Sequence, residues 1–163
     1  MCQRLSLNGL SSILDETMEK LMRQSKTGKT VSRITLDGLF SISDKQAQFI
    51  ANFKGDLGLR KIANISEEQA RSISQHQGGL DLGGLSFIEE DIIILLGWHK
   101  GRISLTGLKT ITDEQAEAFS KAKCLFSIPR IVLTEKQAQI LAKSKVMPHL
   151  GEKEKEKVNK YIK

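Results

Sequence analysis

Apolar residues recur along the chain in two alternating patterns. In the first, seen in Ile103-Ser-Leu105-Thr-Gly-Leu108, apolar and polar positions alternate, which is typical of a strand with one buried side. In the second, which follows a few residues later, apolar residues stand three or four apart, as on one face of a helix. The two patterns together predict a short strand followed by a helix, many times over.

The strand-and-helix unit repeats at a nearly constant interval. Four copies begin, at a step of 23 residues, at Ile34, Leu57, Leu80 and Ile103. A fifth copy from Phe126 keeps the step but is one residue shorter before its helix, and an earlier copy from Leu5 stands 29 residues before Ile34. A fixed period of this size predicts about six stacked units rather than a globule with a single core.

Each predicted helix carries its own start signal. Four units have a hydroxyl residue followed three positions later by glutamine, the pattern of a capping box: Ser43/Gln46, Ser66/Gln69, Thr112/Gln115 and Thr134/Gln137. The unit beginning at Leu80 departs from this pattern, because Glu89 and Ile92 hold the two positions. Its helix is expected to be less well capped.

These units resemble leucine-rich repeats of the bacterial form LxLxGLxxITDExAxALA, over about residues 4–145. The resemblance implies an α/β solenoid shaped as a short horseshoe arc, with a parallel sheet on the concave side and helices on the convex side. The commoner family pattern has asparagine where this chain has Leu39, Ile62, Leu85 and Leu108, so the buried asparagine ladder is absent. Instead, we expect Gly38, Gly84 and Gly107 to satisfy the turns by adopting unusual dihedral angles.

The two ends of the chain differ from the repeats. Residues 1–149 are predicted to form the solenoid, and the highly charged residues 150–163 either a tail or a capping helix. At the other end, the chain runs directly into the first strand. Its open edge would be shielded by the long first unit, covered by a partner or a second copy, or continued in a longer chain.

Composition narrows the functional classes. The net charge of +6 is mild for 25 basic and 19 acidic residues, so a dedicated nucleic-acid binder is not favoured. No stretch is long and apolar enough to span a bilayer. Two distant cysteines suggest a reducing compartment rather than a disulfide framework. The chain is expected to be cytoplasmic, or exported without an N-terminal signal peptide as a host-delivered effector would be.

Several fragments resemble catalytic or metal-binding signals but are weak. Gly28-Lys29-Thr30 resembles the end of a phosphate-binding loop, yet Arg23 stands where that motif requires glycine. His76 and His99 hold equivalent positions, which indicates either a metal pair or two solvated residues near helix ends; we favour the latter. Cys124 falls where a small buried residue is expected. We therefore predict no catalytic residue, no metal and no cofactor.

The concave strand face is the best candidate for function. We predict a non-enzymatic module that binds another protein through small polar residues flanked by arginines and aspartates. The predicted contact residues are Arg4, Ser6, Asn8, Arg33, Thr35, Asp37, Asp56, Arg60, Asp81, Arg102, Ser104 and Thr106. The alternative interpretation is that small residues merely relieve crowding on a curved sheet.

Two further hypotheses remain open at this stage. The chain could be a structural or self-assembly domain that uses its N-terminal edge or an apolar convex patch at Ile94 and Trp98. Those two residues stand where other units have polar ones, so they are either packed locally against neighbouring helices or exposed for a partner. A weaker hypothesis is nucleic-acid contact through the basic residues Lys20, Arg23, Lys26, Lys29 and Arg33.

Overall fold

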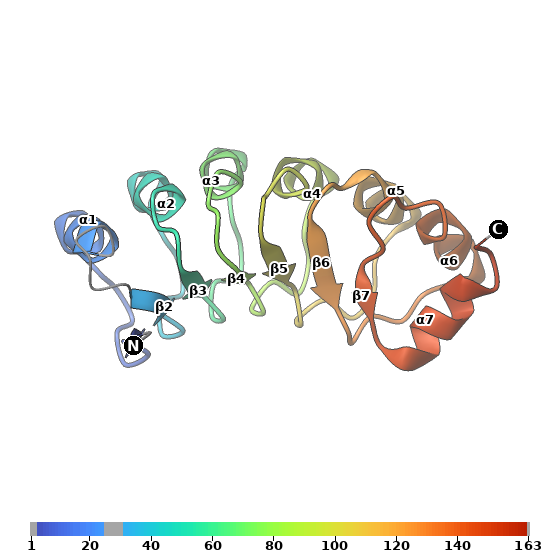
Figure 1. Cartoon of the computed structure of the whole chain (residues 1–163), viewed down its shortest axis with the longest axis horizontal. Coiled ribbons are helices and arrows are strands. Elements are labelled where there is room, and N and C mark those ends of the chain that lie inside the picture. Colours follow the sequence, from blue (N-terminus) through green and yellow to red (C-terminus); the bar gives the residue numbers. More distant parts are fainter. Residues whose placement is uncertain (1–2, 25–30, 163) are drawn as a thin grey trace.

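Strands and helices alternate along the whole described part of the chain. The computed structural model describes residues 3–24 and 31–162. Within them, seven strands form one all-parallel sheet in the order of the sequence. Figure 1 shows every helix except the last in a row on one side of the strands, with successive units side by side, whereas the last helix lies at the lower right, beside the end of the sheet. The prediction of a repeat-like α/β arrangement is confirmed, with one strand more than the six units expected.

The elements are short and regular. The strands are β1 (Gln3–Ser6), β2 (Val31–Thr35), β3 (Asp56–Gly58), β4 (Leu80–Asp81), β5 (Arg102–Ser104), β6 (Leu125–Ile128) and β7 (His149–Leu150). The helices are α1 (Asp15–Gln24), α2 (Asp44–Ala51), α3 (Glu67–Ile73), α4 (Glu90–Leu96), α5 (Asp113–Lys121), α6 (Glu135–Leu141) and α7 (Glu152–Asn159).

The core lies between the strands and the helices. Alternation along each strand sends one residue inward, and these residues are in register across the sheet: Ile34, Leu57, Leu80, Ile103 and Phe126. The alanine of each capped helix is fully buried, as Ala47 and Ala116 show. Because alanine is small, each helix can approach the strand layer closely.

All four predicted capping boxes are present. In α5, for example, the Thr112 hydroxyl accepts from the backbone N–H of Gln115 at 3.1 Å, and the Gln115 side chain accepts from the Thr112 N–H at 2.8 Å. By contrast, the side chain of Glu89 makes no capping hydrogen bond to α4, as expected. Ile92 takes the place of the glutamine and is buried.

The capping glutamines also join neighbouring units. Each side-chain NH₂ donates to a backbone carbonyl in the preceding unit: Gln46 to Ile13, Gln69 to Ile42, Gln115 to Ile88 and Gln137 to Ile111, at 2.6–3.0 Å. We call this set the glutamine ladder. It satisfies carbonyls that the helices and strands leave free, and so supplies bonding between turns without an asparagine ladder.

The prediction for the turn glycines was wrong in its mechanism. None of Gly38, Gly84 and Gly107 has a left-handed φ. A Cβ at any of them would instead overlap backbone carbonyl oxygens of the preceding unit, such as that of Leu10 for Gly38. Glycine is needed here because the turns of adjacent units touch, not because the turns require unusual dihedral angles.

The charged C-terminal segment forms a seventh strand and helix. Glu154 of α7 is buried, and its carboxylate accepts from the backbone N–H of Leu133 at 3.0 Å. Lys157 pairs with Glu154 at 3.0 Å and donates to the Leu133 carbonyl at 2.6 Å. The Tyr161 hydroxyl donates to Glu135 of α6 at 2.6 Å. Of the two structures anticipated for this segment, the helix is the one observed, and it packs on α6.

The first unit is less well covered than the others. Met18 and Met22 of α1 are buried against the core, but Leu10 and Leu14 are 40% and 77% exposed. Association of two copies through this edge stays a prediction. None of the helices described, α1 to α7, is both long and apolar enough to cross a membrane.

The glutamine ladder leads to a prediction about stability. Gln137→Glu keeps an acceptor for the Thr134 N–H, and glutamate serves in capping boxes as well as glutamine does. It cannot donate to the Ile111 carbonyl, however, and would place a carboxylate beside it. We expect the free energy of unfolding, measured by urea denaturation, to fall by about 1–3 kcal/mol.

Gln139→Glu is the matched control, because Gln139 is an exposed residue of the same helix. It is expected to change stability by less than about 0.5 kcal/mol. Equal stability of Gln137→Glu and the wild type would show that the bond between units contributes nothing.

Candidate functional site

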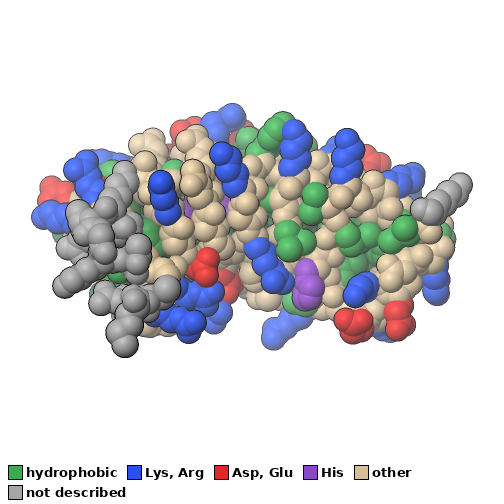
Figure 2. All heavy atoms as spheres, viewed as in Figure 1, with side chains coloured by type: hydrophobic (Ala, Val, Ile, Leu, Met, Phe, Trp, Pro, Cys, Tyr) green, Lys and Arg blue, Asp and Glu red, His purple; other side chains and the backbone are tan. Residues whose placement is uncertain are grey.

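The solvent side of the sheet, called the sheet face below, carries polar residues in columns. The strand register aligns one residue from each of six strands: Ser6, Thr35, Gly58, Asp81, Ser104 and Ser127. Figure 2 shows acidic and basic side chains gathered together over the first described strands. Equivalent strand positions of successive units therefore lie side by side and form a continuous polar surface.

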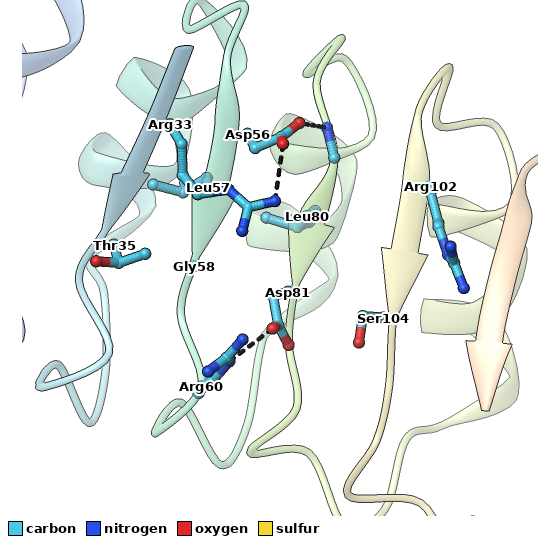
Figure 3. A pocket seen from close by; sticks show the side chains of 11 residues that line it. Arg33, Thr35, Asp56, Leu57, Gly58, Arg60, Leu80, Asp81, Arg102 and Ser104 are labelled. Atoms are coloured by element: carbon cyan, nitrogen blue, oxygen red, sulfur yellow. Dashed lines mark hydrogen bonds and ion pairs between the residues drawn. The ribbon is translucent and has the colours of Figure 1, made fainter. Parts of the chain in front are cut away.

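A hollow of about 460 Å³ lies at the centre of the sheet face (Figure 3). Its lining includes seven of the predicted contact residues: Arg33, Thr35, Asp56, Arg60, Asp81, Arg102 and Ser104. The other five lie outside the lining: Arg4, Ser6, Asn8, Asp37 and Thr106. The structure thus brings together residues from β2, β3, β4 and β5 that are distant in sequence.

Two glycines in the lining, Gly58 and Gly79, are absent from the predicted contact set. A Cβ on Gly58 would lie 2.8 Å from Asp37 Oδ1, and one on Gly79 would lie 2.9 Å from Asp56 Oδ1. The missing side chains make room for these carboxylates. The sequence did contain a signal for these two glycines, because both stand at strand positions where the neighbouring units have polar residues of the sheet face.

Arginines and aspartates of the sheet face bind one another across neighbouring units. Arg33 Nη2 lies 2.9 Å from Asp56 Oδ2, and Arg60 Nε lies 2.6 Å from Asp81 Oδ2 (Figure 3). Arg60 also lies 3.9 Å from Asp37. Because these ion pairs are partly exposed, each contributes little to stability. Their main effect is to hold the arginine side chains in defined positions.

Backbone groups add to the binding of these carboxylates. Asp56 accepts from the Gly79 N–H at 2.9 Å, and Asp37 accepts from the Arg60 N–H at 3.1 Å. Partial burial by itself would raise the pKa of Asp56, but the hydrogen bonds from Arg33 and Gly79 hold that pKa below its usual value. Asp56 is therefore ionised at neutral pH, and the surface carries fixed charges of both signs.

Arg102 differs from the other two arginines of the hollow. It is exposed and donates to the Ser127 hydroxyl at 3.0 Å. Among the described residues, no carboxylate lies within ion-pair distance of it. Arg102 therefore presents guanidinium N–H groups, beside Ser104, that an incoming carboxylate could accept from.

Ile94 and Trp98 lie on the surface of the helix layer. They are 46% and 61% exposed, so the interpretation that they pack locally against neighbouring helices was wrong. The Lys123 ammonium lies 3.6 Å from the centre of the Trp98 ring, within the range of a cation–π contact. Whether this surface contacts a partner stays a prediction.

His76 and His99 are buried in the core rather than solvated. Both are buried, so the preferred interpretation of solvated residues near helix ends was wrong. Their rings stack 5.5 Å apart and nearly parallel, and Phe53 stacks on His76 at 6.0 Å. No group of three potential metal-binding side chains occurs in residues 3–24 and 31–162. The three rings are equivalent residues of successive units and form part of the core.

The hydrogen bonds of the two histidines define their protonation. Each Nε2–H donates at 2.9 Å to a backbone carbonyl of the preceding unit, that of Gly55 for His76 and that of Gly78 for His99. Each Nδ1 is buried without a partner. Burial, assisted by the neighbouring His99, lowers the pKa of His76 to about 4, and burial also lowers the pKa of His99. Both rings are thus neutral at pH 7.

Cys124 occupies a buried position, as expected. Its thiol donates to the Leu96 carbonyl at 3.4 Å, and burial raises its pKa to about 12. A thiol in this state is a poor nucleophile at neutral pH, because the thiolate is the reactive form.

The described residues of the basic N-terminal segment, Lys20, Arg23 and Arg33, do not form a single patch. Arg23 pairs with Glu19 at 2.6 Å, and Arg33 belongs to the sheet face, where it pairs with Asp56. Lys26, Lys29 and the Gly28-Lys29-Thr30 fragment lie outside the described residues. Lys20 is exposed on α1. The described part of the segment gives little support to nucleic-acid contact.

Comparison with known proteins gives no further guide to function. No protein-family model, no curated protein and no solved structure matches the chain.

The buried histidines lead to a prediction about pH. The folded-state pKa of His76, about 4, is below the unfolded value of about 6.5, so the unfolded chain binds the proton more readily. The contribution of neutral His76 to the free energy of unfolding is complete above about pH 6.5 and is lost as the pH falls toward about 4. The free energy of unfolding should fall by about 3 kcal/mol over this range because of His76. Urea unfolding measured across this range should show it.

His76→Phe tests the origin of this loss. Phenylalanine already stands at the equivalent Phe53, so the ring should fit. We expect stability to fall less steeply with acid in this variant than in the wild type. His149→Gln changes an exposed histidine and is expected to retain the wild-type dependence. An unchanged slope in His76→Phe would mean that other groups cause the acid sensitivity.

Proposed function

We propose that this chain is a leucine-rich-repeat solenoid that binds a partner protein through its concave strand face, and that it is not an enzyme. The observation that carries the proposal is the hollow on the sheet face, where seven predicted contact residues from four strands meet around a glycine-lined backbone. The repeat-like α/β arrangement, with the sheet on one side and helices α1 to α6 on the other, supports this assignment.

The side chains of the hollow suit recognition of a polar protein surface. Arg33 and Arg60 are already held by aspartates, so they lose little conformational freedom when a partner binds. Arg102 and Ser104 offer donors on the β5 side. An extended segment with a carboxylate for Arg102 and backbone groups for the polar column would complement these features.

The side chains most suited to catalysis, a thiol and two imidazoles, lie in the core and not in the hollow. The Cys124 thiol is buried with a raised pKa, and His76 and His99 are stacked and donate to backbone carbonyls. The carboxylates of the hollow are paired with arginines rather than with a nucleophile or a base. These observations favour a binding role over catalysis.

The proposal predicts the effect of changes confined to the hollow. Arg102→Glu combined with Ser104→Tyr would reverse the charge of the arginine of the hollow that pairs with no described carboxylate, and would obstruct the floor of the hollow. Neither residue is part of the hydrophobic core, so folding should be retained. We expect recovery of a partner in quantitative affinity capture to fall by about tenfold or more.

The matched control is Lys45→Glu with Ser41→Tyr, two exposed positions on the other side of the unit. It should recover the partner as the wild type does. If the hollow variant folds normally and retains the partner, the concave face is not the binding surface.

A further inference from the structure

The loops that lead from helices to strands form a separate surface, independent of the sheet face. Residues 97–101, 121–125 and 142–148, which include the last three of these loops, contain five lysines and no acidic residue. The lysines are Lys100, Lys121, Lys123, Lys143 and Lys145, and all are exposed. We call these five lysines and Trp98 the helix-end edge. Figure 2 shows a row of basic side chains along the upper part of the molecule.

The lysines are concentrated in one part of the chain. At the equivalent positions of the second and third units stand Asn52, Lys54, Gln75 and Gln77, so only one of the four is charged. All of these helices point their negative dipole ends toward the same side, which favours lysine equally at every helix. The dipoles therefore do not account for a cluster limited to the loops after α4, α5 and α6.

Apolar side chains are exposed among these lysines. Trp98 is 61% exposed and Ile94 is 46% exposed. With Lys121 and Lys123 they line a shallow hollow of about 170 Å³. Lys123 covers the Trp98 ring at 3.6 Å, which holds the indole beside the positive charge. Exposing tryptophan and isoleucine to water is unfavourable, and this surface keeps both side chains beside Lys121 and Lys123.

Few negative charges oppose this edge. Glu117 lies 4.0 Å from Lys121, and both side chains are largely exposed. The other acidic residues of α4, α5 and α6 stand in the first turns, at the opposite ends of the helices: Glu90, Asp91, Asp113, Glu114 and Glu135. Most acidic residues of α4, α5 and α6 thus lie away from the helix-end edge.

We propose that the helix-end edge binds the surface of an anionic lipid bilayer, with Trp98 and Ile94 entering the headgroup layer. Stacking in register places the lysines in a row, which suits the many phosphate and carboxylate groups of a flat lipid surface. Tryptophan is favoured at the boundary between headgroups and acyl chains. Isoleucine gains from the same boundary but cannot stack on a base, which favours lipid over single-stranded nucleic acid.

Vesicle sedimentation tests the proposal with defined probes. The wild type should sediment with vesicles of phosphatidylcholine containing about one third phosphatidylserine, and not with phosphatidylcholine alone. Binding should weaken as salt is added. Because Trp98 is the only tryptophan of the chain, its fluorescence reports the edge directly. We expect emission to shift to shorter wavelength when anionic vesicles are added.

Two variants distinguish the effect of the helix-end edge on vesicle binding from the effect of net charge. Lys100→Glu, Lys121→Glu and Lys123→Glu together should weaken binding by about tenfold or more. The control, Lys45→Glu with Lys109→Glu and Arg130→Glu, makes the same change in net charge at the helix-start side and should bind nearly as the wild type does. Trp98→Asn introduces the residue found at the equivalent Asn52, so it should fold, and it should bind several-fold more weakly.

Three results would overturn the proposal. The first is no sedimentation of the wild type with anionic vesicles at low salt. The second is equal loss of binding in the edge variant and the control, which would make net charge the cause. The third is unchanged Trp98 emission on binding. Retention of a single-stranded oligonucleotide without vesicle binding would likewise reassign the edge to nucleic acid.

Discussion

The hydrogen bond from each capping glutamine to a carbonyl of the preceding unit is the contact on which the stack depends most closely. The same amide group caps its own helix and satisfies the previous turn, so local and long-range structure are formed together. Gln115 and Gln137 are nearly fully buried, where an unmade hydrogen bond would be costly. In α4 the position belongs to Ile92, which joins the core instead of the ladder. The parallel strand pairing continues through that unit, so one apolar substitution is tolerated.

Stacking in register also determines the surfaces. Most residues of a 23-residue unit have an equivalent in the next unit, so residues at one repeat position form a column along the stack. On the sheet face, the columns bring arginine beside aspartate, and the charges pair within the molecule. At the helix ends, the equivalent positions carry lysine in several neighbouring loops, and the only ion pair that these lysines make with the described residues is that of Lys121 with Glu117. The same geometry therefore produces one surface on which Arg33 and Arg60 are paired with aspartates and one edge on which lysines gather.

The buried ring stack of Phe53, His76 and His99 shows a compromise in the core. Each histidine satisfies a backbone carbonyl that phenylalanine could not, yet it leaves Nδ1 without a partner. The arrangement is favourable only while the rings are neutral. Glycines at 55, 78 and 101 let the backbones of adjacent units pass closely at this point, because a Cβ at any of them would overlap a neighbouring carbonyl. The close packing of this part of the core and the predicted acid sensitivity thus both result from the burial of the two histidine rings.

The sequence by itself determined the period, the strand and helix of each unit, the capping boxes and the columns of the sheet face, because these depend on local pattern and on strict repetition. It did not reveal the bond from each glutamine to the previous unit, the true reason for the turn glycines, or the burial of His76 and His99. Those depend on how closely consecutive turns approach. Nor did it decide whether Ile94 and Trp98 were covered. That outcome depended on the separation and orientation of neighbouring helices, which only the tertiary structure supplies.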